Sequence, residues 1–289
     1  MMGLYQVMDV LLPFSWLSPT FMKTALIAVL VASVLFGTLG TFVVSNRMSF
    51  FSDAIGHSSL AGIALGSLVG VHDVTAAMVA FSLVLGFLII AVKVKGNTAS
   101  DVVIGVFAST SVALGIVILS SGGSFGKWQG YLVGDILSIT PRQILLLVCC
   151  ALVVLAVWAT LYNQMLLVSL HSSFATSRGV HTFAVELVFS LLVALVVAVS
   201  IRWTGLLVVN SMLVLPAASS RLVSKSCHGY VMLSILVAII SGVAGLCASY
   251  YMGTAAGASI VLVNAVVFAL CFALGALRGG ARYGARGDI

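Results

Sequence analysis

The chain of 289 residues is 62% hydrophobic and only 7% charged, with a formal net charge of +6. Soluble domains carry about 25% charged residues, so this composition excludes a water-covered globular protein. The basic residues are scattered between apolar segments, which is typical of membrane topology and does not indicate nucleic-acid binding.

Nine apolar segments follow one another along the chain, each long enough for a helix that enters or crosses a bilayer. They are 22–44, 53–70, 74–93, 101–120, 143–168, 183–201, 205–220, 229–250 and 258–277. The segments 53–70 and 205–220 are short, which fits re-entrant or tilted helices. The sequence therefore predicts an all-α, polytopic transmembrane bundle of eight to nine spans, forming a single domain over residues 1–289.

The basic residues between the segments predict the orientation. One set of alternate connections, with the C-terminal tail, contains Arg47, Lys93, Lys95, Arg178, Arg221, Lys225, Arg278, Arg282 and Arg286. The opposite set contains Lys23, Lys127, Arg142 and Arg202. Because cytoplasmic loops carry the excess of Lys and Arg, we expect an external N-terminus and a cytoplasmic C-terminus.

One acidic residue and one histidine stand out at the start of the second segment. Asp53 and His57 are four residues apart and would share a helix face, aiming a carboxylate and an imidazole at one point. Such a pair is half of a site for a divalent transition metal. The alternative is a helix-capping aspartate with a neighbouring histidine. Glycines at 62, 66 and 70 lie on another face and predict close helix packing.

The remaining acidic residues inside the chain suggest structural roles. Asp73 and Asp101 precede or open predicted helices, which favours N-capping. Glu186 lies at the start of a segment near Arg178 and His181, which favours an interfacial ion pair.

Sequence motifs for catalysis are absent. The chain contains no GxxxxGK[ST], HExxH or GxSxG pattern, so any ATP chemistry must come from another chain. An intramembrane metallohydrolase built on Asp53 and His57 would need about three protein ligands and an activated water. An ATP-independent metal channel or secondary transporter is a further alternative.

Five blocks of the sequence resemble one family. MSFFSDAIGHSSLAGIALG (48–66) is similar to a signature of ABC-3 metal permeases, the membrane subunits of bacterial zinc, manganese and iron importers. The similarity continues in family order through DVVIGVFASTSVALGIVIL (101–119), YLVGDILSIT (131–140), GLLVVNSMLVLPAASSRLVS (205–224) and SYYMGTAAGASIVLV (249–263).

The resemblance implies a fold related to type II ABC importer permeases and a place in the bacterial cytoplasmic (inner) membrane. It implies a transporter subunit and not an enzyme, with Zn²⁺ or Mn²⁺ as substrate and no permanently bound cofactor. The implied partners are a second permease copy or a paralogue, a cytoplasmic ABC ATPase subunit, and a periplasmic or lipoprotein metal-binding protein.

The resemblance also assigns roles to individual residues. Asp53 and His57 match the family's Asp and His that contact metal in the pathway. Asp135 matches the acid of the GDIL block, where metal contact and loop structure are both open. Pro216, Arg221 and Lys225 match the region that meets the ATPase, and Pro216 favours a bend leading into a short helix along the inner face.

The sequence departs from the family pattern at several positions. Ala61 replaces a usual proline, which predicts a straighter helix after His57. Gly253 and Thr254 replace an acid–proline pair, which argues against a metal contact at that turn. Asn210 and Asn264 are polar residues within apolar segments, where each could hydrogen-bond across helices, line the path or simply pack.

Overall fold

The computed structural model describes residues 14–71, 73–96, 99–121, 134–170 and 172–284. Two basic residues used to predict the orientation, Lys127 and Arg286, lie outside this part of the chain, as do the side chains of Arg278 and Arg282.

The described residues form ten α-helices and two short 3₁₀ helices, without a strand. In chain order these are η1 (Ser15–Leu17), α2 (Thr20–Ser45), α3 (Phe51–Val69), α4 (Val74–Gly96), α5 (Ser100–Ser121), η2 (Ile136–Ser138), α8 (Pro141–Leu170), α9 (Ser172–Ser177), α10 (Thr182–Thr204), α11 (Leu206–Val223), α12 (Cys227–Met252) and α13 (Ala256–Gly284). Each of the nine predicted segments corresponds to one long helix, which confirms the all-α prediction.

Eight of the described helices are long and apolar enough to cross a membrane. Helix α3 is not among them, whereas α11, which the sequence presented as a short segment, is. The polar residues of FSDAIGHSS at the start of α3 lower its hydropathy below that of its neighbours. Of the nine predicted segments, eight therefore form helices with the length and hydropathy of a membrane span, and the ninth, α3, is less apolar.

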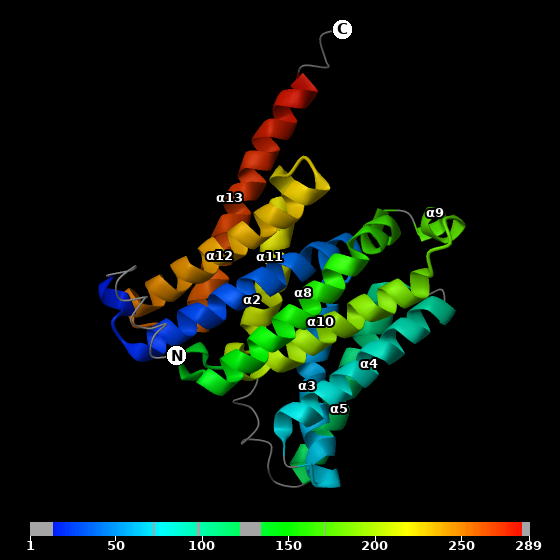
Figure 1. Cartoon of the computed structure of the whole chain (residues 1–289), viewed down its shortest axis with the longest axis vertical. Helices are drawn as coiled ribbons and strands as arrows, with labels where there is room; N and C mark the ends of the chain where they lie inside the picture. Colours follow the sequence, from blue (N-terminus) through cyan, green and yellow to red (C-terminus); the bar gives the residue numbers. More distant parts are fainter. Residues whose placement is uncertain (1–13, 72, 97–98, 122–133, 171, 285–289) are drawn as a thin grey trace.

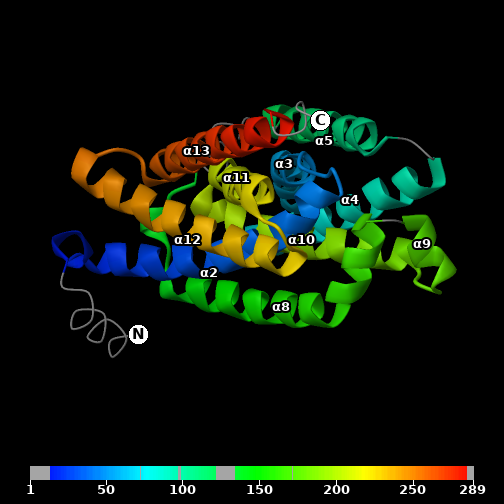
Figure 2. The same ribbon diagram turned by 90° about the horizontal axis from the view of Figure 1, so that it is seen from above.

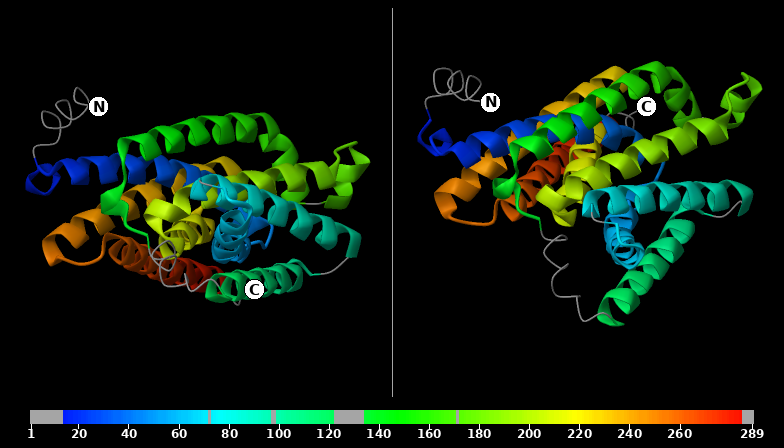
Figure 3. Two further views of the ribbon diagram at one scale, coloured as in Figure 1. Left: turned by 90° about the horizontal axis from the view of Figure 1, so that it is seen from below. Right: turned by 60° about the horizontal axis from the view of Figure 1, so that its bottom comes forward.

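Helix α2 lies at the centre of the bundle and packs against α8, α11 and α12 (Figures 1 and 2). Seen from above, α8 covers one side of the molecule, while α13 and α5 lie on the opposite side (Figure 2). Helices α11 and α3 lie between these two outer layers, as a view from below also shows (Figure 3). In α2, 72% of the apolar 18-residue stretch is buried within the chain, but in α13 only 11% is. Helix α13 therefore presents most of its surface outward.

Glycines bring the central helices into backbone contact. A Cβ at Gly40 of α2 would collide with the carbonyl oxygen of Leu213 in α11. On α3, Gly62 and Gly66 face α4, where Cβ atoms would press against Phe81 and Ala77, which confirms the predicted packing face. Gly70 does not belong to that face, because it ends α3 with φ of 79°. Glycine adopts this left-handed conformation without the Cβ penalty of other residues.

Helix α3 begins well inside the bundle. The ring of its first residue, Phe51, lies beside Gly86, and Gly86 in turn faces Ala194. Gly86 and Ala194 lie near the midpoints of α4 and α10, so the first turn of α3 is at mid-height of its neighbours. From this level α3 runs toward the turn between α10 and α11, where Gly56 faces Ile201 and Leu206. Asp53 therefore lies near mid-height, and His57 lies between that level and the turn.

Helix α11 continues through Pro216 to Val223. The predicted separate helix along the inner face is therefore wrong. The proline removes one backbone hydrogen bond, but Ala217 packs beside Gly40 and the hydroxyl of Ser220 donates to the Pro216 carbonyl. Tight packing against α2 therefore keeps the helix continuous.

Polar contacts tie the helix ends together at each end of the bundle. At what we call the inner end, Lys93 Nζ lies 2.9 Å from Glu186 Oε2, and Arg221 donates to the Val44 carbonyl at 3.5 Å. At the opposite, outer end, Arg202 donates to Thr75 Oγ1 at 3.3 Å. Lys93 and Arg221, from the first set of basic residues, thus lie at one end of the bundle, and Arg202, from the opposite set, lies at the other end, as the charge pattern predicted.

The predicted ion pair of Glu186 exists, but its partner is different. Glu186 pairs with Lys93 of α4, and Arg178 instead stacks over the ring of Phe174 at 5.0 Å. Residue 93 lies far from 186 in sequence, and only the packing of α4 against α10 brings the two charges together.

Segments 169–182 and 217–228 should be cytoplasmic if the charge bias sets the orientation. The five cysteines form no disulfide in the structure, so a cysteine-free background is a practical starting point. Single cysteines at Ser173 or Ser224 should resist an impermeant maleimide in intact cells, whereas one at Ser18, at the outer end, should react. Ready labelling at Ser173 or Ser224 would reverse the orientation.

Candidate functional site: an acid–histidine pair joined by an asparagine

Asp53 and His57 lie one turn apart on α3, and their side chains converge as the spacing predicts. His57 Nε2 is 3.6 Å from Asp53 Oδ1, with 41% of the His57 side chain and 44% of the Asp53 side chain exposed. The distance is longer than a hydrogen bond. The two groups therefore present one oxygen and one nitrogen donor to the same open space.

The N-cap of α3 does not explain Asp53. The N-cap residue is Phe50, which makes no side-chain capping bond, and Asp53 is in the first turn. The Asp53 carboxylate instead accepts a hydrogen bond from Asn210 Nδ2 of α11 at 2.5 Å. The geometry therefore supports a cross-helix role over the capping alternative.

Asn210 is the residue that sequence reasoning did not assign to the site. Its position in an apolar segment was the available signal, but that signal did not distinguish cross-helix bonding from simple packing. The structure shows that its side chain bonds across helices to Asp53. Asn264, the second such residue, is 1% exposed on α13, and its amide atoms have no hydrogen-bond partner among the described residues.

Asp135 holds the short helix η2. Its Oδ1 accepts from the Leu137 amide at 3.0 Å, and Ser138 Oγ donates to its carbonyl at 2.9 Å. The preceding Gly134, with φ of 65°, lies against the backbone of Gly205 at the start of α11. Asp135 is exposed at the outer end. Its hydrogen bonds show that it stabilises the loop. Its contact with metal stays a prediction.

Two other acidic residues have structural positions. Asp73 Oδ1 accepts from the amides of Thr75 and Ala76 at 2.9 and 3.4 Å, which confirms the predicted cap. Asp101 lies in the first turn of α5, inside the helix and not at the N-cap, so that part of the prediction is wrong. Its negative charge is favourable there, because helix N-termini carry partial positive charge.

The turn after α12 is built from hydroxyl groups. Gly253 ends the helix with φ of 63°, and Ser249 Oγ donates to the Thr254 carbonyl at 2.6 Å. Thr254 Oγ1 lies 2.8 Å from Ser259 Oγ. The hydroxyls thus hold the turn at the position where the family pattern has an acid–proline pair.

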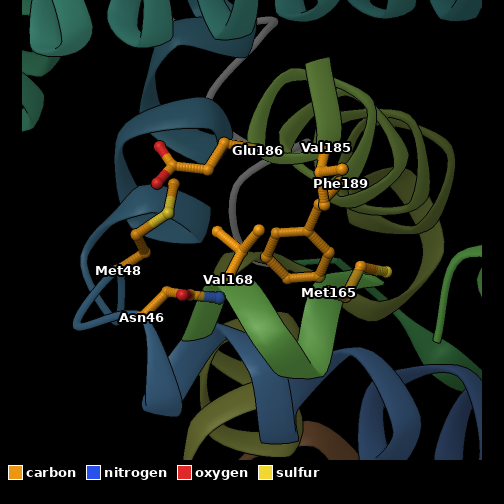
Figure 4. A pocket seen from close by; sticks show the side chains of 7 residues that line it. All are labelled: Asn46, Met48, Met165, Val168, Val185, Glu186 and Phe189. Carbon is orange, nitrogen blue, oxygen red and sulfur yellow. The ribbon is translucent and has the colours of Figure 1, made fainter. Parts of the chain in front are cut away.

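A separate pocket lies toward the inner end, between α8, α10 and the connection from α2 to α3 (Figure 4). The space in it that the centre of a water molecule can reach is only about 10 Å³. It is lined by Asn46, Met48, Met165, Val168, Val185, Glu186 and Phe189. Its one carboxylate is paired with Lys93, so the pocket does not extend the Asp53–His57 site. Within the described residues, no three His, Cys, Asp or Glu side chains gather as a ready-made metal centre.

The region predicted to meet an ATPase lies at the inner end. Pro216 is buried within α11, Arg221 is exposed in its last turn, and Lys225 is exposed in the connection to α12. Arg221 also contacts the end of α2 through the Val44 carbonyl. The two bases are thus accessible from one end of the bundle.

The described residues contain eight helices that are long and apolar enough to cross a membrane, as in a multi-pass membrane protein. A model of the ABC 3 transport family matches residues 18–275. The chain belongs to this family.

Two relatives show the extent of the similarity. The chain is 30% identical over 259 residues to the high-affinity zinc uptake system membrane protein ZnuB of Buchnera aphidicola subsp. Baizongia pistaciae, covering 89% of this chain and 95% of that protein. It is 31% identical over 252 residues to the manganese import system permease protein ScaB of Streptococcus gordonii, covering 87% and 90%. These relatives are transporter subunits and not enzymes.

Solved structures share the fold. PsaBC from Streptococcus pneumoniae in complex with Fab contains a chain with a TM-score of 0.75 and 28% identity, covering 94% of this chain and 95% of that one. An inward-facing metal-chelate type ABC transporter has a TM-score of 0.63 at 16% identity, covering 89% and 85%, and shows the fold alone.

Proposed function

We propose that the chain is the permease subunit of an ATP-driven importer that carries Zn²⁺ or Mn²⁺ into the cytoplasm. The family match over residues 18–275 and the zinc and manganese systems among the relatives support this function. Iron, the third metal that the family resemblance implied, stays a further substrate to test. The single structural observation that carries the proposal is the convergence of Asp53 and His57 on one partly exposed face of α3.

The exposure of this pair supports a path between two permease copies. A carboxylate and an imidazole facing lipid would be unfavourable by roughly 2.5–3.5 kcal/mol for the carboxylate alone on insertion scales. Both side chains are nevertheless more than two-fifths exposed on the isolated chain. A second copy or a paralogue, placed against this face, would enclose them in a polar passage.

The proposed site supplies only a few protein ligands to the cation. One carboxylate oxygen and one imidazole nitrogen, with water completing the shell, would hold a divalent cation while leaving its release easy. We propose that the energy for import comes from a cytoplasmic ABC ATPase subunit, and that a periplasmic or lipoprotein metal-binding protein delivers the cation. The whole chain, 1–289, would act as one domain in the bacterial inner membrane.

The test is reconstitution of the permease with an ABC ATPase and a metal-binding protein from the same organism. Proteoliposomes should accumulate radioactive manganese or zinc only when ATP is supplied on the ATPase side and metal-loaded binding protein on the other. A vanadate-inhibited ATPase is the control and should abolish accumulation. Equal accumulation without ATP would instead support a channel or a secondary transporter.

A further inference from the structure

Three polar side chains from two helices meet at one carboxylate oxygen. Asp53 Oδ1 accepts the hydrogen bond from Asn210 Nδ2, and His57 Nε2 lies 3.6 Å from the same atom. Residues 53 and 210 are 157 positions apart in the sequence. Because α3 and α11 come from distant parts of the chain, the packing of the bundle places Asn210 at this point.

The amide oxygen of Asn210 has no role in this arrangement. Asn210 Oδ1 is buried and has no hydrogen-bond partner among the described residues. A buried acceptor without a partner is unfavourable, and native structures contain few of them. The same amide group carries both a donor and an acceptor. A half-turn about its terminal bond therefore exchanges the nitrogen that faces Asp53 for the oxygen.

We propose that Asn210 is a third protein ligand for the transported cation, an inference that rests on the function proposed above. Without a cation, the amide nitrogen donates to Asp53 and holds the carboxylate in place. A cation bound to Asp53 repels the N–H groups and attracts the amide oxygen, so the amide turns and the oxygen joins the ligands. Asp53, His57 and Asn210 then supply two oxygens and one nitrogen.

The amide oxygen shifts the relative preference of the site toward manganese, although a given nitrogen and oxygen site binds Zn²⁺ more tightly than Mn²⁺ in absolute terms. Carboxylate, carbonyl and water oxygens suit Mn²⁺ in an octahedral shell, whereas imidazole suits Zn²⁺. Zinc is satisfied by four ligands in a tetrahedron. Loss of one amide oxygen therefore weakens manganese binding more than zinc binding. In this respect Asn210 changes the ratio of the two metal affinities, in addition to positioning Asp53.

The test compares both metals on the purified permease–ATPase complex. Mn²⁺ binding is followed by the electron paramagnetic resonance signal of the free ion, and Zn²⁺ binding by competition against it. Asn210→Leu should weaken Mn²⁺ binding roughly tenfold, in the range that metal-site changes usually cost, with a clearly smaller effect on Zn²⁺. Equal weakening of both metals, which a purely positioning role predicts, would overturn the proposal. So would unchanged binding.

Matched variants keep the test decisive. Asn264→Leu makes the same substitution at another buried amide, on α13, and should leave the ratio of the two affinities unchanged. If Asn210→Leu does not assemble, Asn210→Asp decides, because it keeps an oxygen ligand and removes the amide donor. Retained or tighter Mn²⁺ binding supports the ligand role, and lost Mn²⁺ binding refutes it.

Failure of the function proposed for the chain has a separate signature. A wild-type complex that accumulates neither metal in an ATP-dependent manner contradicts the importer and, with it, this inference. A wild-type complex that transports metal, combined with an unchanged affinity ratio in Asn210→Leu, contradicts the role of Asn210 alone.

Discussion

Asp53→Ala and His57→Ala should each reduce metal uptake severely while the permease still assembles with its ATPase. Each change removes one of the two side chains that converge on α3. Even indirect changes around a metal site typically cost about 10- to 100-fold in affinity or activity, and loss of a ligand should cost at least as much. Uptake of radioactive manganese or zinc by proteoliposomes measures the effect.

Asp53→Asn separates ligand chemistry from shape. The amide keeps the volume of the side chain but is a much poorer ligand for a divalent cation than a carboxylate. If Asp53 served only to cap α3, asparagine would be mild, because it caps helices as well as aspartate. Asp73→Asn is the matched control, since Asp73 does cap α4, and its uptake should stay near wild type. Near-normal uptake by an assembled Asp53→Asn, His57→Ala double variant would end the metal-site proposal.

The second large effect is expected at the inner end of α11. Arg221→Glu and Lys225→Glu should each lower co-purification of the ATPase and reduce uptake, because both exposed bases lie where a cytoplasmic partner can reach them. Reversal of a charge at an interface places like charges together or removes a complementary pair. Co-purification in detergent and ATP-dependent uptake measure the two consequences.

Two comparisons distinguish coupling from damage to the fold. Arg221 also holds the carbonyl of Val44, so its variant needs a thermal unfolding curve close to wild type before a loss is assigned to the interface. Lys225 lies outside α11 in the connection to α12 and provides the cleaner variant. Arg142→Glu, exposed at the outer end, should leave ATPase association unchanged. Wild-type association and uptake in both inner-end variants would refute the coupling role.

Hydropathy along the sequence was sufficient to predict the nine long helices, because each one satisfies its own backbone hydrogen bonds within an apolar segment. It could not place α3 relative to the others. The level at which α3 begins depends on Phe51 packing beside Gly86 of α4, a tertiary contact. Likewise, Pro216 favoured the end of a helix locally, yet α11 continues through it to Val223, packed against α2.

The candidate site was only partly predictable for the same reason. Asp53 and His57 belong to one helix, so their spacing was enough to bring them together. Asn210 comes from α11, and Lys93 and Glu186 from α4 and α10, so the partners of these residues depend on the packing of distant helices. Asp135 was chosen as a candidate because it matches the GDIL motif, which does not distinguish metal contact from loop structure. The structure adds a hydrogen bond from the Leu137 amide to the Asp135 carboxylate.

The deep start of α3 has an electrostatic consequence for any cation that reaches Asp53. The N-terminus of a helix carries the equivalent of about half a positive charge, from amide groups that lack partners within the helix. In most spanning helices this charge lies near water, but Phe51 places it at mid-height of the bundle, and Asp53 is in that first turn. The partial charge stabilises the carboxylate and repels the cation, so Asp53 binds metal less tightly than the same side chain elsewhere. Since an ion that is held too firmly cannot leave, the position of the helix end itself favours rapid passage.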